Sequence, residues 1–145
     1  METNVSVRLV NSMKHLMWHL RKIDTEVISK YGLSFNEYRV FQTIAYRKSI
    51  NPKVLTEKHK IYYSNMTGII DKLVKNGFVI RKRDESDRRM VNIELSSKGR
   101  AIKEEIEKEI EKRITEYCRN LPEDRLEKAS LAIEEILEVI EEETR

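Results

Sequence analysis

Residues 61–95 read IYYSNMTGIIDKLVKNGFVIRKRDESDRRMVNIEL, and this stretch decides the fold. In its first half, apolar residues recur three and four positions apart, which is typical of an amphipathic helix that ends at Gly77. Those residues are Met66, Ile69, Ile70, Leu73 and Val74. The second half changes to a period of two, with Val91, Ile93 and Leu95 alternating with polar residues. Together with a second strand candidate at 78–83, this alternation predicts a β-hairpin directly after the helix.

A second short helix precedes this stretch. Asn51 followed by Pro52 is typical of a helix start, because Asn caps the helix and proline fits its first position. The pattern predicts a helix from about 52 to 58, separated from the next helix by a tight turn. Two short helices followed by a hairpin form a winged helix-turn-helix, in which one helix fits the major groove of DNA and the hairpin loop reaches the minor groove. A helix pair alone is a weak signal, and the adjoining basic hairpin strengthens it.

Amphipathic helices are expected on both sides of this region. Residues 5–30 carry apolar side chains at alternating steps of four and three, and Gly32 is the expected end of that helix. Ser34 and Glu37 have the spacing of a capping box at the start of the next helix. After residue 97 two more apolar stripes follow, and Pro122 separates them.

These elements predict a mainly α (α+β) fold. We expect a winged helix-turn-helix DNA-binding domain at 33–99 and a helical dimerisation region at 1–32 and 100–145. The charge distribution agrees, because residues 47–100 hold 14 Lys and Arg against 6 Asp and Glu, a net +8, whereas residues 101–145 have a net charge of −7. A basic middle indicates an anionic partner, most simply nucleic acid.

Composition also argues against other classes of protein. Cys118 is the only cysteine, so no internal disulfide can form, and we expect a cytoplasmic protein. No window approaches the roughly 20 apolar residues of a membrane span. There is no phosphate-binding loop, nucleophile elbow or Cys/His cluster at the spacing of an active site. We therefore expect neither an enzyme nor a cofactor.

Three acids, Asp84, Glu85 and Asp87, lie among the five cations of the hairpin. A purely electrostatic arm would omit them, because each cancels part of the attraction to an anion. Asp and Ser side chains bond nearby backbone N–H groups in turns, so we predict that Asp84, Ser86 and Asp87 fold the loop. Asp87 is also placed to hold the guanidinium of Arg89. The alternative is a solvated loop whose charges pair with one another for little energy.

The exposed face of the helix before the hairpin is small, polar and basic. Asn65 has the amide that pairs with adenine, and the hydroxyls of Ser64 and Thr67 suit phosphate or either base. Gly68 would let the DNA approach closely, at a cost in helix stability of roughly 1 kcal/mol relative to Ala. The alternative is an ordinary amphipathic helix with a solvated face. The candidate DNA contacts on this helix are Tyr63, Ser64, Asn65, Thr67, Gly68 and Lys72.

The runs TGIIDKLVKNGFVIRKRD and DESDRRMVNIELSSKG resemble the recognition helix and wing of the MarR family of transcription regulators. That family has D-x-R at the wing, followed by a strand that ends in Leu-(Thr/Ser)-x-x-Gly. The resemblance covers essentially the whole chain. It implies that Arg89 enters the minor groove beside Asp87, with Arg83 and Arg88 near phosphates. Tyr62 and Tyr63 depart from the small polar residues that are more usual at the start of the family's helix.

The same resemblance implies a small ligand, often an aromatic or phenolic acid. In many relatives it enters a crevice between the dimer helices and the DNA-binding lobe. For Trp18 and Phe35 the alternative is a place in the core, and for Lys14 it is a solvated surface charge. The candidate ligand-binding residues are Lys14, His15, Trp18, Phe35, Tyr38 and Arg89. His15 and His19 have the i, i+4 spacing of metal ligands, but two imidazoles make an incomplete site, so we predict no metal.

The apolar seams of the first and the last two helices exceed what a small central domain can bury, so we expect a homodimer. A two-fold dimer would set two recognition helices about 34 Å apart and read a pseudo-palindromic operator in double-stranded DNA. The predicted function is a sequence-specific homodimeric repressor that a small ligand releases. The alternatives are a monomer and a winged-helix module for protein contacts without specific DNA binding.

Overall fold

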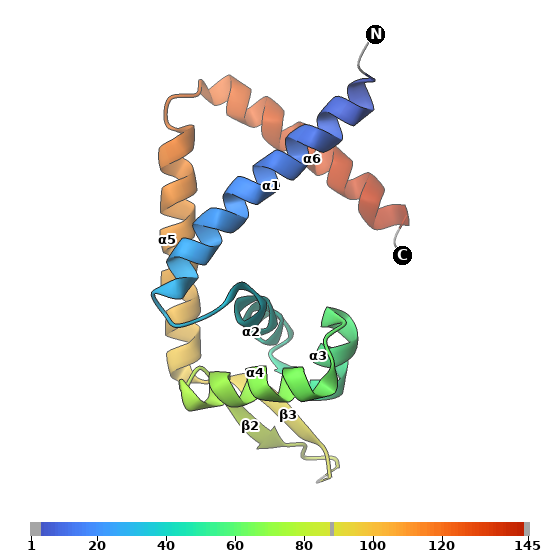
Figure 1. Ribbon diagram of the computed structural model, residues 1–145, viewed down its shortest axis with the longest axis vertical. Coiled ribbons are helices and arrows are strands. Elements are labelled where there is room, and N and C mark those ends of the chain that lie inside the picture. Colours follow the sequence, from blue (N-terminus) through green and yellow to red (C-terminus); the bar gives the residue numbers. More distant parts are fainter. Residues whose placement is uncertain (1–3, 88, 144–145) are drawn as a thin grey trace. The chain divides into compact units, whose positions relative to one another are not determined.

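The computed structural model describes residues 4–87 and 89–143, and Figure 1 shows their arrangement. The chain divides into two compact units, residues 1–110 and 111–145, and each is described by itself. The elements in chain order are α1 (Val5–Ser29), α2 (Phe35–Arg47), β1 (Ser49–Ile50), α3 (Pro52–His59), α4 (Tyr63–Lys75), β2 (Val79–Arg83), β3 (Val91–Leu95), α5 (Ser97–Cys118) and α6 (Glu123–Glu143). This order confirms the predicted mainly α winged helix-turn-helix fold.

Local capping interactions start the helices where the sequence predicts. The Ser34 N–H donates to Glu37 Oε2 at 2.7 Å, and the Glu37 N–H donates to Ser34 Oγ at 3.3 Å, which completes the capping box of α2. Asn51 Oδ1 accepts from the Lys53 N–H at 2.8 Å at the start of α3. Both starts are confirmed, because each depends only on residues two or three positions apart.

Glycine ends two of the helices of the first unit. Gly32 follows α1 with φ +70°, and Gly77 follows α4 with φ +75°. These left-handed conformations are the ones that glycine adopts without steric cost. The turn after Gly77 leads directly into β2, so the recognition helix and the hairpin are joined by a short, defined connection (Figure 1).

The sheet is antiparallel with the strand order β1-β3-β2. In the hairpin, Val79 pairs with Leu95 and Arg83 with Val91, so the two predicted strands are confirmed. The sequence analysis did not predict β1, which pairs Ser49 with Glu94 and Ile50 with Ile93. Two residues are too few to show an alternating pattern, and this strand forms only because β3 offers it a partner.

The hydrophobic core of the first unit lies between α1, α2, α3, α4, the sheet and the first half of α5, which contributes the buried Ile106. Met66, Ile70 and Leu73 are buried on the inner face of α4, as its apolar period predicts. The rings of Phe41 and Phe78 pack with centroids 5.9 Å apart, which ties α2 to the start of β2. Burial of this face leaves the opposite side of α4 in solvent.

The start of α5 is fixed against the turn before β2. Ser96 Oγ donates to Gly77 O at 2.5 Å and accepts from the Gly99 N–H at 2.8 Å. A Cβ atom at Gly99 would lie 1.9 Å from Phe78 O, so only glycine fits at this position. The connection between β3 and α5, residues 95–99, therefore requires both the hydroxyl of Ser96 and a glycine at position 99.

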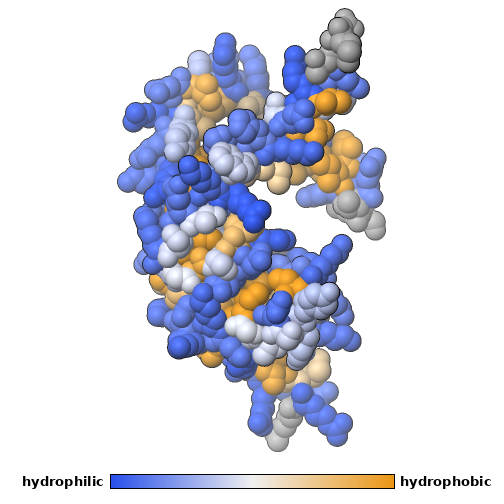
Figure 2. Space-filling view, viewed as in Figure 1, coloured by the Kyte–Doolittle hydropathy of each residue, from blue (hydrophilic) through white to orange (hydrophobic). Residues whose placement is uncertain are grey.

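Long apolar faces remain exposed in both units. In α1 only Val27 and Ile28 are buried, and hydrophobic residues gather at its surface in Figure 2. In α6 no residue is buried, although Leu131, Leu137 and Ile140 are large and apolar. None of the helices in the described part of the chain has the length and apolar character that crossing a membrane requires.

Candidate nucleic-acid interface

The N-terminal half of α4 presents a continuous exposed face. Ser64, Asn65, Thr67 and Gly68 are all exposed, while Met66 between them is buried. Thr67 Oγ1 donates to Tyr63 O at 3.0 Å, so its hydroxyl oxygen keeps acceptor capacity toward solvent. Apart from its chain neighbours and the backbone of its own helix, no atom of the described residues lies within 4 Å of a Cβ placed at Gly68, so this glycine faces open space.

Two tyrosines stand at the beginning of this face. The exposed fractions of Tyr62 and Tyr63 are 83% and 65%. Tyr62 is the N-cap residue of α4 and makes no side-chain cap hydrogen bond, so the first N–H groups of the helix have no side-chain acceptor there. An aromatic pair in this position is apolar surface that would be shielded only by a binding partner.

The Asp84 carboxylate makes most of the side-chain hydrogen bonds that fold the hairpin loop. Asp84 Oδ1 accepts from the Ser86 N–H at 2.8 Å, from Ser86 Oγ at 2.5 Å and from the Asp87 N–H at 3.1 Å. Its Oδ2 accepts from Asn92 Nδ2 at 3.0 Å, which attaches the loop to β3. The hydrogen bond from Ser86 Oγ, with those from the two N–H groups, lowers the pKa of Asp84 to about 2. The prediction that the acids fold the turn is confirmed for Asp84.

Asp87 contributes a second turn-forming contact. Its Oδ1 accepts from the Arg89 N–H at 3.0 Å, and its carbonyl accepts from the Met90 N–H at 2.8 Å. The carboxylate thus holds the main chain of Arg89 and not its guanidinium, contrary to the expected contact. A side chain two residues away reaches the backbone first, as in an Asx-turn, and leaves the guanidinium at the exposed tip.

The cations of the hairpin differ in how they are held. Arg81 is ion-paired with Asp71, which connects β2 to α4, and Lys82 Nζ lies 3.8 Å from Glu94 Oε1. Arg83 and Arg89 are exposed. Arg88, the remaining candidate, lies outside the described residues. Arg81 therefore braces the hairpin, while Arg83 and Arg89 extend toward solvent.

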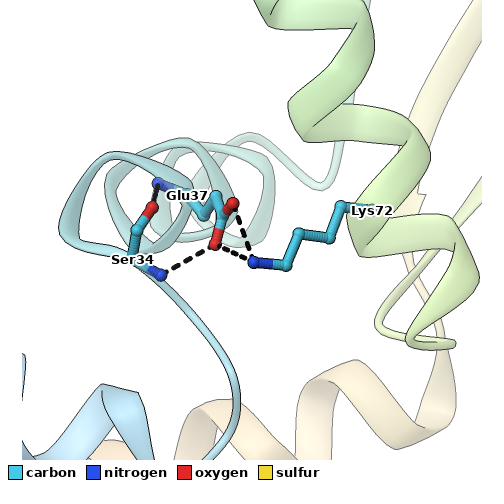
Figure 3. A network of polar contacts seen from close by, with 3 residues as sticks. All are labelled: Ser34, Glu37 and Lys72. Carbon is cyan, nitrogen blue, oxygen red and sulfur yellow. Dashed lines mark hydrogen bonds and ion pairs between the residues drawn. The ribbon is translucent and has the colours of Figure 1, made fainter.

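Lys72 is engaged by another helix (Figure 3). Its Nζ donates to Glu37 Oε1 at 2.9 Å and to Oε2 at 2.8 Å, and the Oε2 atom also accepts from the Ser34 N–H. Burial raises the pKa of Glu37, but the hydrogen bonds from Lys72 and Ser34 outweigh it and hold this pKa below its usual value. One carboxylate thus caps α2 and ties it to α4.

The comparisons with known proteins place this arrangement in a family. Residues 22–106, more than half of the chain, match the family described as "Transcriptional regulator SarA/Rot". The chain belongs to this family of transcriptional regulators. It is a DNA-binding regulator with a winged helix-turn-helix, and not an enzyme, and the resemblance noted in its wing and recognition helix is confirmed.

Two regulators illustrate the family's relatives in sequence. The chain is 26% identical to the HTH-type transcriptional regulator FarR of Neisseria gonorrhoeae over 110 residues, which cover 76% of this chain and 73% of FarR. It is 33% identical to SarZ of Staphylococcus epidermidis over 78 residues, which cover 54% of this chain and 53% of SarZ. The match therefore spans only about half the length of SarZ.

Solved structures have the same fold. A MarR family protein from Bacillus stearothermophilus superimposes with a TM-score of 0.85 at 18% identity, over 97% of this chain and 98% of that one. Apo MarR from Escherichia coli gives a TM-score of 0.77 at 22% identity, over 89% and 96% of the two chains. At these identities the likeness concerns the fold.

In this SarA/Rot family member, the predicted ligand residues occupy different environments. Tyr38 is buried in the core, and burial raises the pKa of its hydroxyl to about 12, with smaller contributions from Asp24 and Glu107. Phe35 is half-buried, and the Arg21 guanidinium carbon lies 4.3 Å from its ring centroid. Arg89 belongs to the hairpin tip.

The α1 candidates form an aromatic cluster of their own. Trp18 is 59% exposed and packs edge-on against His19 at 4.7 Å, while its ring centroid lies 6.4 Å from that of His15. Lys14 is exposed on the same helix. Within the described residues, no group of three or more His, Cys, Asp or Glu side chains is arranged to hold a metal ion.

Two parts of the site were not predicted. The role of Glu37 toward Lys72 joins positions 35 residues apart, and no local pattern indicates such a contact. The bracing pair of Arg81 and Asp71 was missed for the same reason, since it connects a strand to a helix across a turn. The sequence offered one weak signal in each case: Glu37 and Asp71 are acids in or near a stretch rich in Lys and Arg.

Proposed function

We propose that this regulator binds pseudo-palindromic double-stranded DNA as a homodimer, represses the genes it controls, and is released by a small aromatic or phenolic acid. The observation that carries the DNA-binding part is the placement of an exposed, polar helix face beside a hairpin whose tip is folded by Asp84. A folded tip presents its cations without the entropic cost of ordering a flexible loop on binding.

Within this proposal, α4 enters the major groove and the hairpin tip enters the minor groove. Asn65 and Ser64 contact base edges, and Tyr63 and Thr67 contact the sugar-phosphate backbone or thymine methyl groups. Gly68 permits close approach of the helix to DNA. Arg89 enters the minor groove, with Asp87 shaping the loop behind it and with Arg83 and Arg88 at phosphates.

Lys72 has a positioning role in this proposal. Both oxygens of Glu37 accept from its ammonium, and the capping box fixes that carboxylate. Breaking this pair to reach a phosphate would leave Glu37 without its cation at a partly buried position. The pair therefore fixes the angle of α4 against α2 better than it would serve as a DNA contact.

The dimer is supported by the exposed apolar faces of α1 and α6. Side chains such as Leu16 in α1 and Leu137 in α6 are about half exposed, at 50% and 49%. Association of two copies through the helices at 1–32 and 100–145 would remove these faces from water, at roughly 25 cal/mol per Å². The region 33–99 would then remain available for DNA.

Release by a ligand is supported by a series of contacts inside the first unit. Arg21 on α1 lies over the ring of Phe35, which is the first residue of α2, and Ser34 beside it caps the helix that carries Glu37. A flat acid that displaced Arg21 from this ring would act on the end of α2 that holds Lys72. Such coupling requires that the ligand prefer one of two arrangements of this contact.

The affinity for duplex DNA as a function of salt tests the function. A regulator that contacts phosphates loses affinity steeply as salt rises, with a slope of about 0.9 per phosphate on a double-logarithmic plot. The alternative, a winged-helix module for protein contacts, lacks these phosphate contacts, so it predicts that any DNA binding changes little with salt. Arg89→Ala should cost about 1 to 3 kcal/mol of DNA affinity and leave the fold intact.

A further inference from the structure

A polar cavity of about 300 Å³ lies between α2 and α3, and it shares no residue with the interface described above. Four of its residues stand on one face of α2, at helical spacings of three and four, and two come from the C-terminal end of α3. The volume is at the lower end of the range of small-molecule sites. The lining residues are Arg39, Gln42, Thr43, Tyr46, Lys58 and His59.

The charges around this cavity are unbalanced. Arg39 and Lys58 contribute two cations, and no Asp or Glu belongs to the lining among the residues that the structure describes. Within the same residues, neither cation is ion-paired with a carboxylate, unlike Lys72 and Arg81 elsewhere in the unit. A concave surface that carries positive charges and no negative ones concentrates anions.

His59 is oriented by a hydrogen bond. Its Nε2 lies 3.0 Å from Thr43 Oγ1, and the Thr43 hydroxyl donates to Arg39 O at 3.1 Å. The Thr43 hydroxyl has one proton and donates it to the Arg39 carbonyl. The hydrogen between Thr43 Oγ1 and His59 therefore belongs to Nε2 of the ring. This assignment leaves Nδ1 of the neutral ring unprotonated and able to take up a proton.

We infer that this cavity binds the oxyanion of a small molecule, a carboxylate or phosphate group, with Arg39 and Lys58 as anchoring cations and protonated His59 as an additional cation. Tyr46, which is 83% exposed, offers a ring face at the mouth for the rest of the molecule. This site goes beyond the proposed function, because none of its residues belongs to the DNA contacts or to the α1 ligand candidates.

The affinity of the site depends on pH. Burial lowers the pKa of His59 below its ordinary value of 6.5, and the charges of Arg39 and Lys58 lower it further. Among the described residues that line the cavity, Tyr46 is the one titratable group besides His59, Arg39 and Lys58. A bound anion offsets the two cations and raises the pKa of His59, so binding takes up a proton. Affinity therefore increases as the pH falls through the range in which His59 titrates.

The test is a titration of the full chain with sulfate at constant ionic strength. Binding is measured from the ring resonances of His59 in two-dimensional NMR spectra. Sulfate keeps its charge between about pH 5.5 and 7.5, so a change in affinity over this range reports on the protein. The expected result is saturable binding that is roughly threefold tighter or more at the lower pH, the size of a partly exposed ion pair.

Two variants and a control locate the effect. Arg39→Gln should weaken sulfate binding roughly three- to tenfold, because it removes a charge-assisted hydrogen bond. His59→Gln keeps a donor for Thr43 and should keep the affinity of the higher pH while losing the pH dependence. Lys53→Gln, at an exposed position of α3 outside the cavity, should change neither. Thermal unfolding of each variant verifies that it folds.

Non-saturable shifts, or equal affinity of the wild type and Arg39→Gln, would overturn the site, and unchanged pH dependence in His59→Gln would overturn the role of the histidine. Repeating the titration with duplex DNA bound distinguishes the two sources of an oxyanion. A site for a free small molecule still responds to sulfate, whereas a DNA phosphate in the cavity abolishes the response. The titrations without DNA do not depend on whether α4 and the hairpin contact DNA, so they test the site apart from the proposed function.

Discussion

Lys72 on α4 and Glu37 on α2 form an ion pair in which the ammonium lies 2.9 Å and 2.8 Å from the two carboxylate oxygens. Glu37 also caps its own helix through Ser34, so the start of α2 and the recognition helix share one anchor. The side chain of Glu37 is only 15% exposed, which protects the pair from solvent better than an ordinary surface salt bridge. The orientation of α4 therefore depends on a residue outside the face proposed to contact DNA.

Lys72→Gln separates a positioning role from a phosphate contact. If Lys72 positions α4, the variant should bind DNA about 1 kcal/mol more weakly while the salt dependence of binding stays that of the wild type. A phosphate contact would instead reduce the slope by about 0.9. Fluorescence anisotropy with a labelled duplex at several salt concentrations measures both quantities.

A double-mutant cycle supplies the control for that experiment. In Glu37→Gln the amide oxygen can still accept from the Ser34 N–H, while the negative charge that holds Lys72 is removed. If the two residues act as a pair, the double variant should lose little more DNA affinity than either single variant. Additive losses would show that each side chain acts independently.

The stability supplied by Glu37 should depend on pH. Because the folded-state pKa of Glu37 lies below its ordinary value of 4.5, the carboxylate stabilises the protein fully above about pH 5. This stabilisation is lost as the pH falls below 4.5 through the folded-state value. The wild type should therefore exceed Glu37→Gln by about 1 kcal/mol in urea unfolding at pH 7, and the difference should shrink toward pH 3. A difference that grows in acid would contradict this sign.

Asp84→Ala and Glu85→Ala distinguish a folded wing tip from a merely charged one. Both remove one negative charge, so electrostatics alone predicts that both tighten DNA binding. Asp84 also folds the loop, and its loss should weaken binding by about 1 kcal/mol, the cost of ordering the tip on the DNA. Glu85→Ala should bind as well as the wild type or slightly better. Tighter binding by both variants would show that the acids have no structural role in DNA binding.

Gly68→Ala should stabilise the free protein and weaken its DNA complex. No neighbouring segment in the described part of the chain lies within 4 Å of the new methyl group. Alanine favours a helix by about 1 kcal/mol over glycine, which should raise Tm by about 3 °C. Close contact with DNA would be disturbed at a cost of about 1 to 3 kcal/mol. Calorimetry of the free protein and anisotropy with DNA measure the two effects.

Gly99→Ala is the matched control for that variant. Its methyl group would lie 1.9 Å from Phe78 O, so the same substitution should destabilise the protein by about 2 kcal/mol or more. Opposite signs at the two glycines would show that one is retained for folding and the other for a partner. If Gly68→Ala left DNA affinity unchanged, this glycine would have no role in close approach to DNA.

The elements that were predictable from sequence depend on local rules. The capping box at Ser34, the proline start of α3 and the alternating strand β3 involve residues no more than four positions apart, and each forms as expected. The contacts of Asp84 were predictable because an Asx-turn is also local. The partner of Asp87 was harder to predict, because the guanidinium and the backbone N–H of Arg89 both belong to the residue two positions away.

The features that could not be predicted depend on tertiary contacts. The pair of Lys72 and Glu37, the strand β1 and the close approach of Gly99 to Phe78 all join segments that are distant in sequence. Tyr38 had a usable signal, because it lies three residues before Phe41 on the buried face of α2, but a tyrosine hydroxyl also suits a ligand. Burial, and not residue type, distinguishes the two roles.

Selection of bound fragments from random duplex DNA by the purified full chain tests the central claim most directly, namely that two copies present α4 and the hairpin tip to one duplex. The account predicts enrichment of two inverted half-sites whose centres lie about one helical turn apart, roughly 10 base pairs. Enrichment of a single half-site without its inverted partner, or no enrichment at all, would contradict it.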